Sequence, residues 1–264
     1  MKRPLLLSAL VACVLVLASV VAGCSADSDA AQALERSHEK SRTLGSRMTM
    51  NMTMTDGGQT VRGRTQAVVE RGGRRMRMTS TFGGVAMEQY LDGSSMLMSI
   101  DSLPLGGASP FPRGTRWLKV DLDELLKEAG LDTSMRELQQ MDPTKLAAML
   151  KDGEIEEAGS GRVRGVPVHR YRATIKLEDL VKSLGAKSSE ISKAIKDSTM
   201  TVTLALDDDD LMRAFQMTGD MNGSQMTMDA VVTSYSRDIG VDVPSGAGVY
   251  DATEMLRGAS RQRR

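Results

Sequence analysis

The clearest pattern in the chain is an alternation of apolar and polar residues that begins at Met48. Every second position up to Met54 is a methionine, and the residues between them are threonine or asparagine. A period of two places alternate side chains on one face of a β-strand. The sequence therefore predicts a strand over 48–55 that carries four methionines on one face: Met48, Met50, Met52 and Met54.

Further alternating segments, separated by glycine- and aspartate-rich turns, predict a long antiparallel meander. Turn chemistry follows the first strand at Asp56-Gly57-Gly58, and two later turns are expected at Gly159-Ser160-Gly161 and Arg164-Gly165. The strands expected after the first cover residues 59–70, 74–82, 85–91, 95–100, 117–120, 154–158, 168–175, 200–206, 211–218 and 225–235.

Helical segments accompany these strands. Residues 33–44 precede the first strand, while 122–150 and 177–195 lie between strand groups and carry apolar residues at helical spacing. A single sheet of this width can bury its apolar face only if it curls or if helices cover it. The predicted fold class is α+β: a single strongly curved antiparallel sheet, a half-barrel of about 10–11 strands, wrapped over small plug helices that act as plug or lid.

The first residues have the order of a targeting segment. Lys2 and Arg3 precede an apolar run from Leu5 to Val21, which is followed by the small residues Ala22 and Gly23. This order predicts a lipoprotein signal peptide over 1–23. The alternative is a transmembrane anchor, which needs about 20 apolar residues to cross a bilayer of ~30 Å. The run is short for that purpose, and no basic stop-transfer flank follows it.

The segment that ends at Cys24, Val-Ala-Gly-Cys, resembles the lipobox of bacterial lipoproteins. The resemblance implies that the Cys24 sulfur receives a diacylglyceryl group and that Cys24 becomes the lipid-modified first residue, with acyl chains such as palmitate. Cys13 is a second match, but cleavage there would leave too short an apolar core before it and an apolar N-terminus over 14–21. Because two acyl chains anchor a protein durably, the expected location is the extracytoplasmic face of the cell membrane.

Composition narrows the functional classes. Without Lys2 and Arg3, 32 of the 34 basic residues remain against 34 acidic residues, so a nucleic-acid partner is not expected. Of the two cysteines, one would be removed and the other acylated, which leaves none for a disulfide. No Gly-x-Ser-x-Gly motif, P-loop or Cys/His metal spacing occurs. The sequence therefore predicts neither an enzyme nor a cofactor.

Methionine takes the place of bulkier apolar residues, with 20 in the chain against three Phe and one Trp. Six more form pairs two residues apart on expected strands: Met76 and Met78, Met96 and Met98, and Met226 and Met228. Methionine is unbranched and adaptable, so such a face would suit a cavity with variable contents, or it is an ordinary core built from methionine. A further alternative is a Cu(I) site, since thioether ligands select this ion. Against it, alternate residues of one strand lie about 7 Å apart, which is too far for both to bind one ion without adjustment.

The order of elements resembles the LolA-like lipoprotein-carrier fold, especially the LppX/LprG-type lipoproteins. The likeness rests on the lipobox at Cys24 and on the segments 163–171, 202–213 and 235–244. It implies a half-barrel around an apolar cavity that holds acyl chains, with the ten methionines named above as cavity-lining, ligand-binding residues. The scarcity of Phe and Trp departs from that pattern.

The sequence thus predicts a membrane-anchored extracytoplasmic lipoprotein that binds and carries a lipid or lipoconjugate. The alternative is an envelope module of the same fold that binds or regulates a partner protein, as the LolA-like domain of a sigma-factor regulator does. Its own side chains would then fill the core. The expected division is a signal peptide over 1–23, a tether over 24–32, a LolA-like lipid-binding domain over 33–250 and a flexible basic tail over 251–264.

Overall fold

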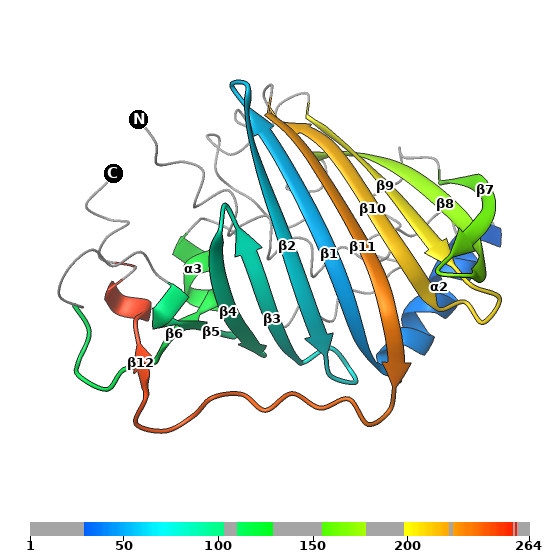
Figure 1. The fold of residues 1–264 in the computed structure, drawn as a ribbon. Coiled ribbons are helices and arrows are strands. Elements are labelled where there is room, and N and C mark those ends of the chain that lie inside the picture. The colour runs from blue at the N-terminus through cyan, green and yellow to red at the C-terminus, as the bar shows by residue number, and fades with distance from the viewer. Residues whose placement is uncertain are drawn as a thin grey trace.

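A single sheet of twelve strands organises the chain (Figure 1). The computed structural model describes residues 29–102, 110–128, 155–177, 198–221, 224–255 and 257. The strands are β1 (Gly45–Asp56), β2 (Gln59–Val69), β3 (Arg75–Phe82), β4 (Val85–Asp92), β5 (Ser95–Ser99), β6 (Trp117–Asp121), β7 (Glu156–Val163), β8 (Val166–Lys176), β9 (Thr199–Leu206), β10 (Met212–Met221), β11 (Ser224–Ser236) and β12 (Val249–Asp251). The helices are α2 (Asp29–Arg42), α3 (Leu122–Glu128) and the short 3-10 helix η1 (Ile100–Ser102).

The two halves of the sheet meet at β1. Its neighbours are β2 on one side and β11 on the other, and the full order is β12-β6-β5-β4-β3-β2-β1-β11-β10-β9-β8-β7. Neighbouring strands are antiparallel except β12 and β6, which run parallel through the pair Val249 and Trp117. The predicted fold class is confirmed: the sheet is a curved half-barrel with small helices, and it has twelve strands where about 10–11 were expected.

The first hairpin shows why the meander forms where the sequence places it. Gly57 and Gly58 connect β1 to β2 with φ angles of 53° and 80°. Both angles lie in the left-handed region, which glycine enters without a Cβ clash. Two consecutive residues of this kind form the tight hairpin turn whose twist matches the flanking strands. The turn thereby sets the register in which the methionines of β1 lie opposite Val61, Gly63, Thr65 and Ala67 of β2, on the same face of the sheet.

The prediction for β7 is wrong in one respect. Gly159-Ser160-Gly161 was expected to be a turn, but these residues lie inside β7, and the pairing with β8 shifts between Glu157 and Ser160. Glycine within a strand often marks such a bulge. The other turn expected here, at Arg164 and Gly165, is confirmed: it connects β7 to β8, with φ angles of 50° and 86°.

Both helices pack on the same face of the sheet, which we call the inner face (Figure 1). Leu34 of α2 lies in an apolar cluster with strands β8 to β11, and Leu122 of α3 lies in a second cluster with strands β2 to β5. Helix α2 confirms the expected helix near 33–44, although it begins earlier, at Asp29. Of the helices expected over 122–150 the structure describes the first seven residues, and of those over 177–195 only Leu177; the rest lies outside the described residues.

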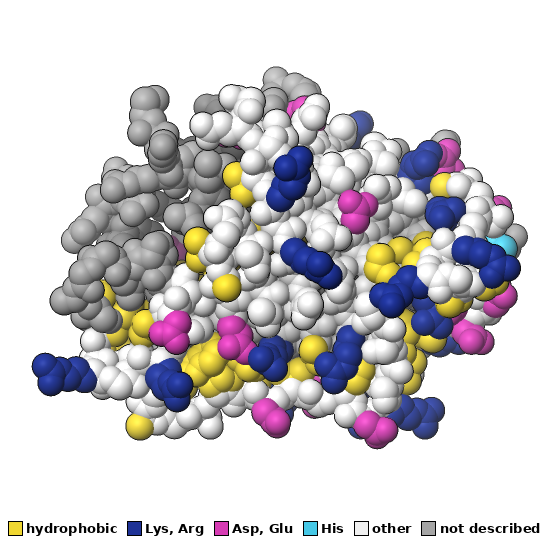
Figure 2. Space-filling model, viewed as in Figure 1, with side chains coloured by type: hydrophobic (Ala, Val, Ile, Leu, Met, Phe, Trp, Pro, Cys, Tyr) yellow, Lys and Arg dark blue, Asp and Glu magenta, His cyan; other side chains and the backbone are white. Residues whose placement is uncertain are grey.

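A segment without regular structure crosses the opposite, outer face. Residues 237–248, which we call the C-terminal strap, lead from the end of β11 past the ends of the strands to β12 (Figure 1). Tyr90 and Leu97 lie on the outer face, since their neighbours Leu91 and Met96 point to the inner cluster, and Val241 of the strap packs against them. Figure 2 shows apolar side chains gathered in the lower part of this face.

The fold continues beyond residue 250, where the sequence analysis placed the start of the tail. Asp251 belongs to β12, and Ala252 and Thr253 are buried. The Thr253 hydroxyl accepts a hydrogen bond of 3.0 Å from the backbone N–H of Asp121, at the end of β6. Residues 251–253 are thus fixed to the sheet edge, with Asp251 in β12 and Thr253 hydrogen-bonded to the end of β6. None of the described helices is both long enough and apolar enough to cross a bilayer.

Candidate functional site: the apolar inner face

Cross-strand register aligns methionines from neighbouring strands on the inner face. Met52 of β1 lies directly opposite Met228 of β11, which in turn lies opposite Met217 of β10. In the next row, Met54 lies opposite Met226. Directly opposite side chains on one face of a sheet have Cβ atoms about 4.5–5.5 Å apart. Thioether side chains that are far apart in sequence are therefore neighbours in the fold.

All ten methionines singled out from the sequence lie on this face, in two apolar clusters. The first cluster includes Met52, Met226 and Met228 as buried members, with Met48, Met50 and Met54 packed at its border. The second includes Met76, Met78 and Met96 as buried members, with Met98 at its border. The period of two along each strand therefore predicted the face of every one of them, while their role in binding stays a prediction.

The central strand joins the two clusters. Met48 and Met50 of β1 pack against both of them, and Met50 lies between Ala230 of β11 and Thr65 of β2 in the sheet register. The inner face is consequently one apolar surface that runs from β5 to β8. Unbranched thioether side chains at its centre can change rotamer at low cost.

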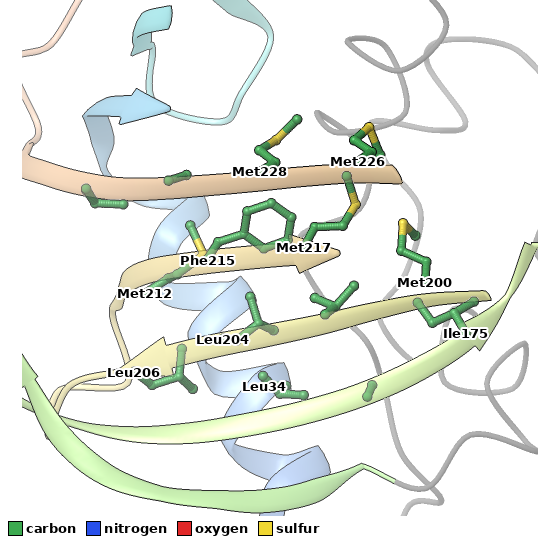
Figure 3. Packing of buried hydrophobic residues seen from close by; sticks show 14 of the residues in the cluster. Leu34, Ile175, Met200, Leu204, Leu206, Met212, Phe215, Met217, Met226 and Met228 are labelled. Atoms are coloured by element: carbon green, nitrogen blue, oxygen red, sulfur yellow. The ribbon is translucent and has the colours of Figure 1, made fainter. Parts of the chain in front are cut away.

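Sequence reasoning missed three further methionines of the first cluster: Met200, Met212 and Met217. Figure 3 shows them beside Phe215 and Met226, with their side chains directed to the same side of strands β9 to β11. Met200 and Met217 lie on strands that the sequence does predict, at positions that alternate with threonines or glutamine. The alternation of apolar and polar residues therefore did place these methionines on the inner face. They were missed because they do not form Met-x-Met pairs.

One polar pair interrupts the inner face. The hydroxyls of Thr65 in β2 and Ser80 in β3 are buried and lie 2.8 Å apart, so that one donates a hydrogen bond to the other. A buried hydroxyl without a partner would be costly, and this pairing across adjacent strands avoids that cost. The row continues from Met50 through Thr65 and Ser80 to Met87.

Charged groups hold α2 at the border of the first cluster. The Nε of Arg36 donates to the carboxylate of Asp210 at 2.9 Å, and Lys40 Nζ lies 3.3 Å from the same carboxylate. Burial acts to raise the pKa of Asp210, but the hydrogen bonds from Arg36 and Lys40 outweigh burial and lower it. The α2 helix is therefore fixed to the β9–β10 turn by charge as well as by Leu34.

A second polar group stabilises the same corner. Asp207 accepts hydrogen bonds from the backbone N–H groups of Asp209 and Leu211, and its carboxylate pairs with Arg213. The Arg213 guanidinium lies 5.6 Å from the centre of the Tyr235 ring. Burial raises the pKa of Tyr235 to about 12. These groups stabilise the turn and the helix contact, and Tyr235 packs at the border of the first apolar cluster.

The carboxylates of Asp207 and Asp210 in the β9–β10 turn are thus engaged within the protein. Within the described ranges no group of three or more His, Cys, Asp or Glu side chains is placed to hold a metal ion. Cu(I) binding by thioethers stays a hypothesis of the sequence. Cys24 lies outside the described residues.

A single curved sheet with helices on an apolar inner face defines a class of one-sheet half-barrel proteins. No family model matches the chain. A curated relative, an uncharacterized 31.2 kDa protein in the rplA-rplJ intergenic region of Streptomyces griseus, is 23% identical over 154 residues, which cover 54% of this chain and 50% of the relative. The chain thus matches half the length of this relative.

Several solved structures are similar in fold. The lipoprotein LppX of Mycobacterium tuberculosis is 14% identical, with a TM-score of 0.44 over 81% of this chain and 100% of that chain. LprF from Mycobacterium bovis is 11% identical, with a TM-score of 0.43 over 81% and 96% of the two chains. The LolA superfamily protein NE2245 from Nitrosomonas europaea is 7% identical, with a TM-score of 0.31 over 81% and 94%. Proteins of the LppX and LolA type, which the sequence analysis names, are thus among the structures that this chain is similar to.

Proposed function

We propose that this protein is a membrane-anchored extracytoplasmic lipoprotein that binds and carries a lipid or lipoconjugate on its inner face. One observation carries the proposal: the inner face holds two apolar clusters, which Met48 and Met50 join across its centre. The partner implied by such a surface is an acyl chain, since its apolar methylenes can replace water along the methionine rows.

The energetics suit a carrier. Each methylene moved out of water contributes about 0.8 kcal/mol, so a long acyl chain gains enough free energy to stay bound without any polar contact. Methionine side chains adapt to chains of different length because they have three rotatable bonds and no branch. Binding and release need no bond to be made or broken, so the proposed function requires no catalytic residue.

The anchor completes the proposal. Cys24 would carry the lipid, and only residues 25–28 would separate it from the start of α2 at Asp29. The binding domain would then stay close to the membrane surface from which its ligand comes. The tether is in this view shorter than the stretch expected from the sequence, because residues 29–32 are helical.

Ligand binding is tested by native mass spectrometry of a chain that begins at Ser25, which retains every described element. We expect a lipid to co-purify with it. Met50→Lys should remove the lipid, because it puts a charge at the centre of the inner face. Asn51→Lys is the matched control, since Asn51 is exposed on the other face of the same strand. Circular dichroism shows whether both variants fold.

Met54→Lys with Thr53→Lys as its control repeats the comparison closer to the hairpin tip. A parent chain that carries no lipid and takes up none from added phospholipid would sink the carrier proposal. That result would favour the same fold with a core filled by its own side chains, which suits a module that binds a partner protein.

The anchor is tested separately by labelling cells with a radioactive fatty acid. Cys24→Ser should abolish both the label and membrane retention, whereas Cys13→Ser should leave the Cys24 label in place. Labelling that persists in Cys24→Ser and disappears in Cys13→Ser would move the attachment site to Cys13.

A further inference from the structure

Two exposed valines mark one end of the inner face. Val61 of β2 is 43% exposed and Val85 of β4 is 46% exposed, whereas Val202 in the first cluster is 3% exposed. Val61 lies opposite Met54, and Val85 lies opposite Phe82. They stand at the tips of the β1–β2 and β3–β4 hairpins, which point to the same side of the molecule (Figure 1). We call Val61, Phe82 and Val85 the valine rim.

Phe82 connects this rim to the buried core. Its ring covers Gly63 of β2 so closely that a Cβ at that position would overlap the ring. Phe82 also packs at the border of the first apolar cluster, as does Met54, the partner of Val61. An apolar surface therefore runs from two solvent-exposed valines to the methionine rows without a charged side chain in the register between them.

The opposite end of these strands is closed by the C-terminal strap. Ile239 and Val241 of the strap are 7% and 6% exposed, and a Cβ added to Gly45, at the start of β1, would lie 2.7 Å from the Cβ of Ile239. The strap thus packs on the outer face at the end of the strands opposite the valine rim. In the described part of the chain, the inner apolar surface reaches solvent at the exposed side chains of Val61 and Val85.

Basic side chains flank the rim. Arg62 and Arg64 alternate with Val61 and Gly63 along β2, so they point to the outer face, and both are exposed. The acidic residue at this tip, Asp56, accepts a hydrogen bond of 3.0 Å from Ser224. Figure 2, which views the outer face, shows Lys and Arg side chains set among mostly uncharged polar ones over the central strands.

We propose that the valine rim, together with Arg62 and Arg64, docks onto an anionic phospholipid surface. Exposed apolar side chains next to basic ones are the combination that binds a membrane interface: the apolar groups enter the boundary between headgroups and acyl chains, and the basic groups meet anionic headgroups. If the inner face binds lipid, as the proposed function requires, this rim is also where an acyl chain passes between the bilayer and Met54.

The docking is tested by co-sedimentation of the chain that begins at Ser25 with vesicles of phosphatidylglycerol and phosphatidylcholine. Val61→Ser with Val85→Ser, and separately Arg62→Gln with Arg64→Gln, should each weaken binding roughly tenfold. Met255→Ser is the matched apolar control, because Met255 is 41% exposed but lies beyond β12. Arg113→Gln with Arg237→Gln is the matched basic control, away from both hairpin tips. Neither control should change binding.

Rim variants that bind these vesicles as tightly as the parent would overturn the docking proposal, and so would controls that weaken binding equally. Uptake of cis-parinaric acid, a fluorescent fatty acid, in the absence of vesicles separates this result from the proposed function. We expect the rim variants to retain this uptake at equilibrium while they lose vesicle binding. A parent that docks but takes up no fatty acid would refute the carrier function and leave the docking surface standing.

Discussion

The hydroxyl of Tyr235 in β11 donates a hydrogen bond of 2.6 Å to the backbone carbonyl of Met212 in β10. Ser41 of α2 acts to lower the pKa of this hydroxyl against the larger effect of burial, and the Tyr235 ring lies near the Arg213 guanidinium. One side chain thus connects a helix and two strands at the border of the first apolar cluster. The corner that positions α2 over the inner face depends on it.

We expect Tyr235→Phe to lower the free energy of unfolding by about 1–2 kcal/mol, because the ring is kept while the Met212 carbonyl loses its hydrogen bond. Urea denaturation measures this difference. Tyr250→Phe is the control, since Tyr250 is half-buried near Phe111 and its change should have little effect. Equal midpoints for Tyr235→Phe and the parent would show that the hydroxyl does not stabilise the fold.

Asp207 and Arg213 give a second prediction for the same corner. Asp207 is 6% exposed and holds both the turn and the guanidinium. Asp207→Asn leaves the Arg213 charge without its partner, so we expect a loss of about 3 kcal/mol in the free energy of unfolding. Asp208→Asn is the control, because it changes a neighbouring side chain that is 77% exposed. Its free energy of unfolding should stay within about 0.5 kcal/mol of that of the parent. Thermal melts of the two variants check the contrast.

The pKa of Asp210 predicts an acid-dependent contact of α2. The pKa of Asp210 is lower in the folded protein than the usual value of 3.8. The contact with Arg36 and Lys40 therefore stabilises the folded state fully above pH 3.8, and this stabilisation is lost as the pH falls through the pKa of Asp210 in the folded protein. Asp210→Asn should therefore lower the free energy that holds α2 in place by about 1 kcal/mol near neutral pH. It should have no effect at a pH where Asp210 is protonated in the parent.

Amide hydrogen exchange in α2, measured for the parent and Asp210→Asn from pH 7 down to a pH at which the Asp210 carboxyl of the folded parent is protonated, checks this difference. Asparagine suits the position because the φ angle of Asp210 is 56°, a region that asparagine tolerates. Asp209→Asn is the matched control, since Lys40 contacts only the Asp209 backbone carbonyl. A difference that stays constant across this range would show that the carboxylate charge does not hold the helix.

The alternation of residues predicted which side chains lie on the inner face, but not which of them are neighbours across adjacent strands. Met52 and Met228 are far apart in sequence, and their contact follows from the pairing of β1 with β11, which no local pattern specifies. β12 was missed because three residues are too few to show a period of two. The glycines of β7 indicated a turn, since local preference favours one, but pairing with β8 keeps them in a bulged strand.

The sequence also did not predict the C-terminal strap. Its residues show no regular period of apolar positions, and its apolar side chains cover the outer rather than the inner face. Its contact with β1 can be tested at Gly45. A methyl group there would lie 2.7 Å from the Ile239 Cβ and 3.0 Å from the Val69 carbonyl oxygen.

Gly45→Ala should consequently lower the free energy of unfolding by about 1–3 kcal/mol, as overpacking does in other cores, and expose the strap to proteolysis. Gly240→Ala is the control, since a Cβ at Gly240 meets nothing within 4 Å. Ile239→Ala in the Gly45→Ala background should relieve the overlap, so that the two changes together cost less than the sum of their separate effects. Strictly additive costs in urea denaturation would mean that Gly45 and Ile239 do not pack against each other, and that the strap lies elsewhere on the sheet.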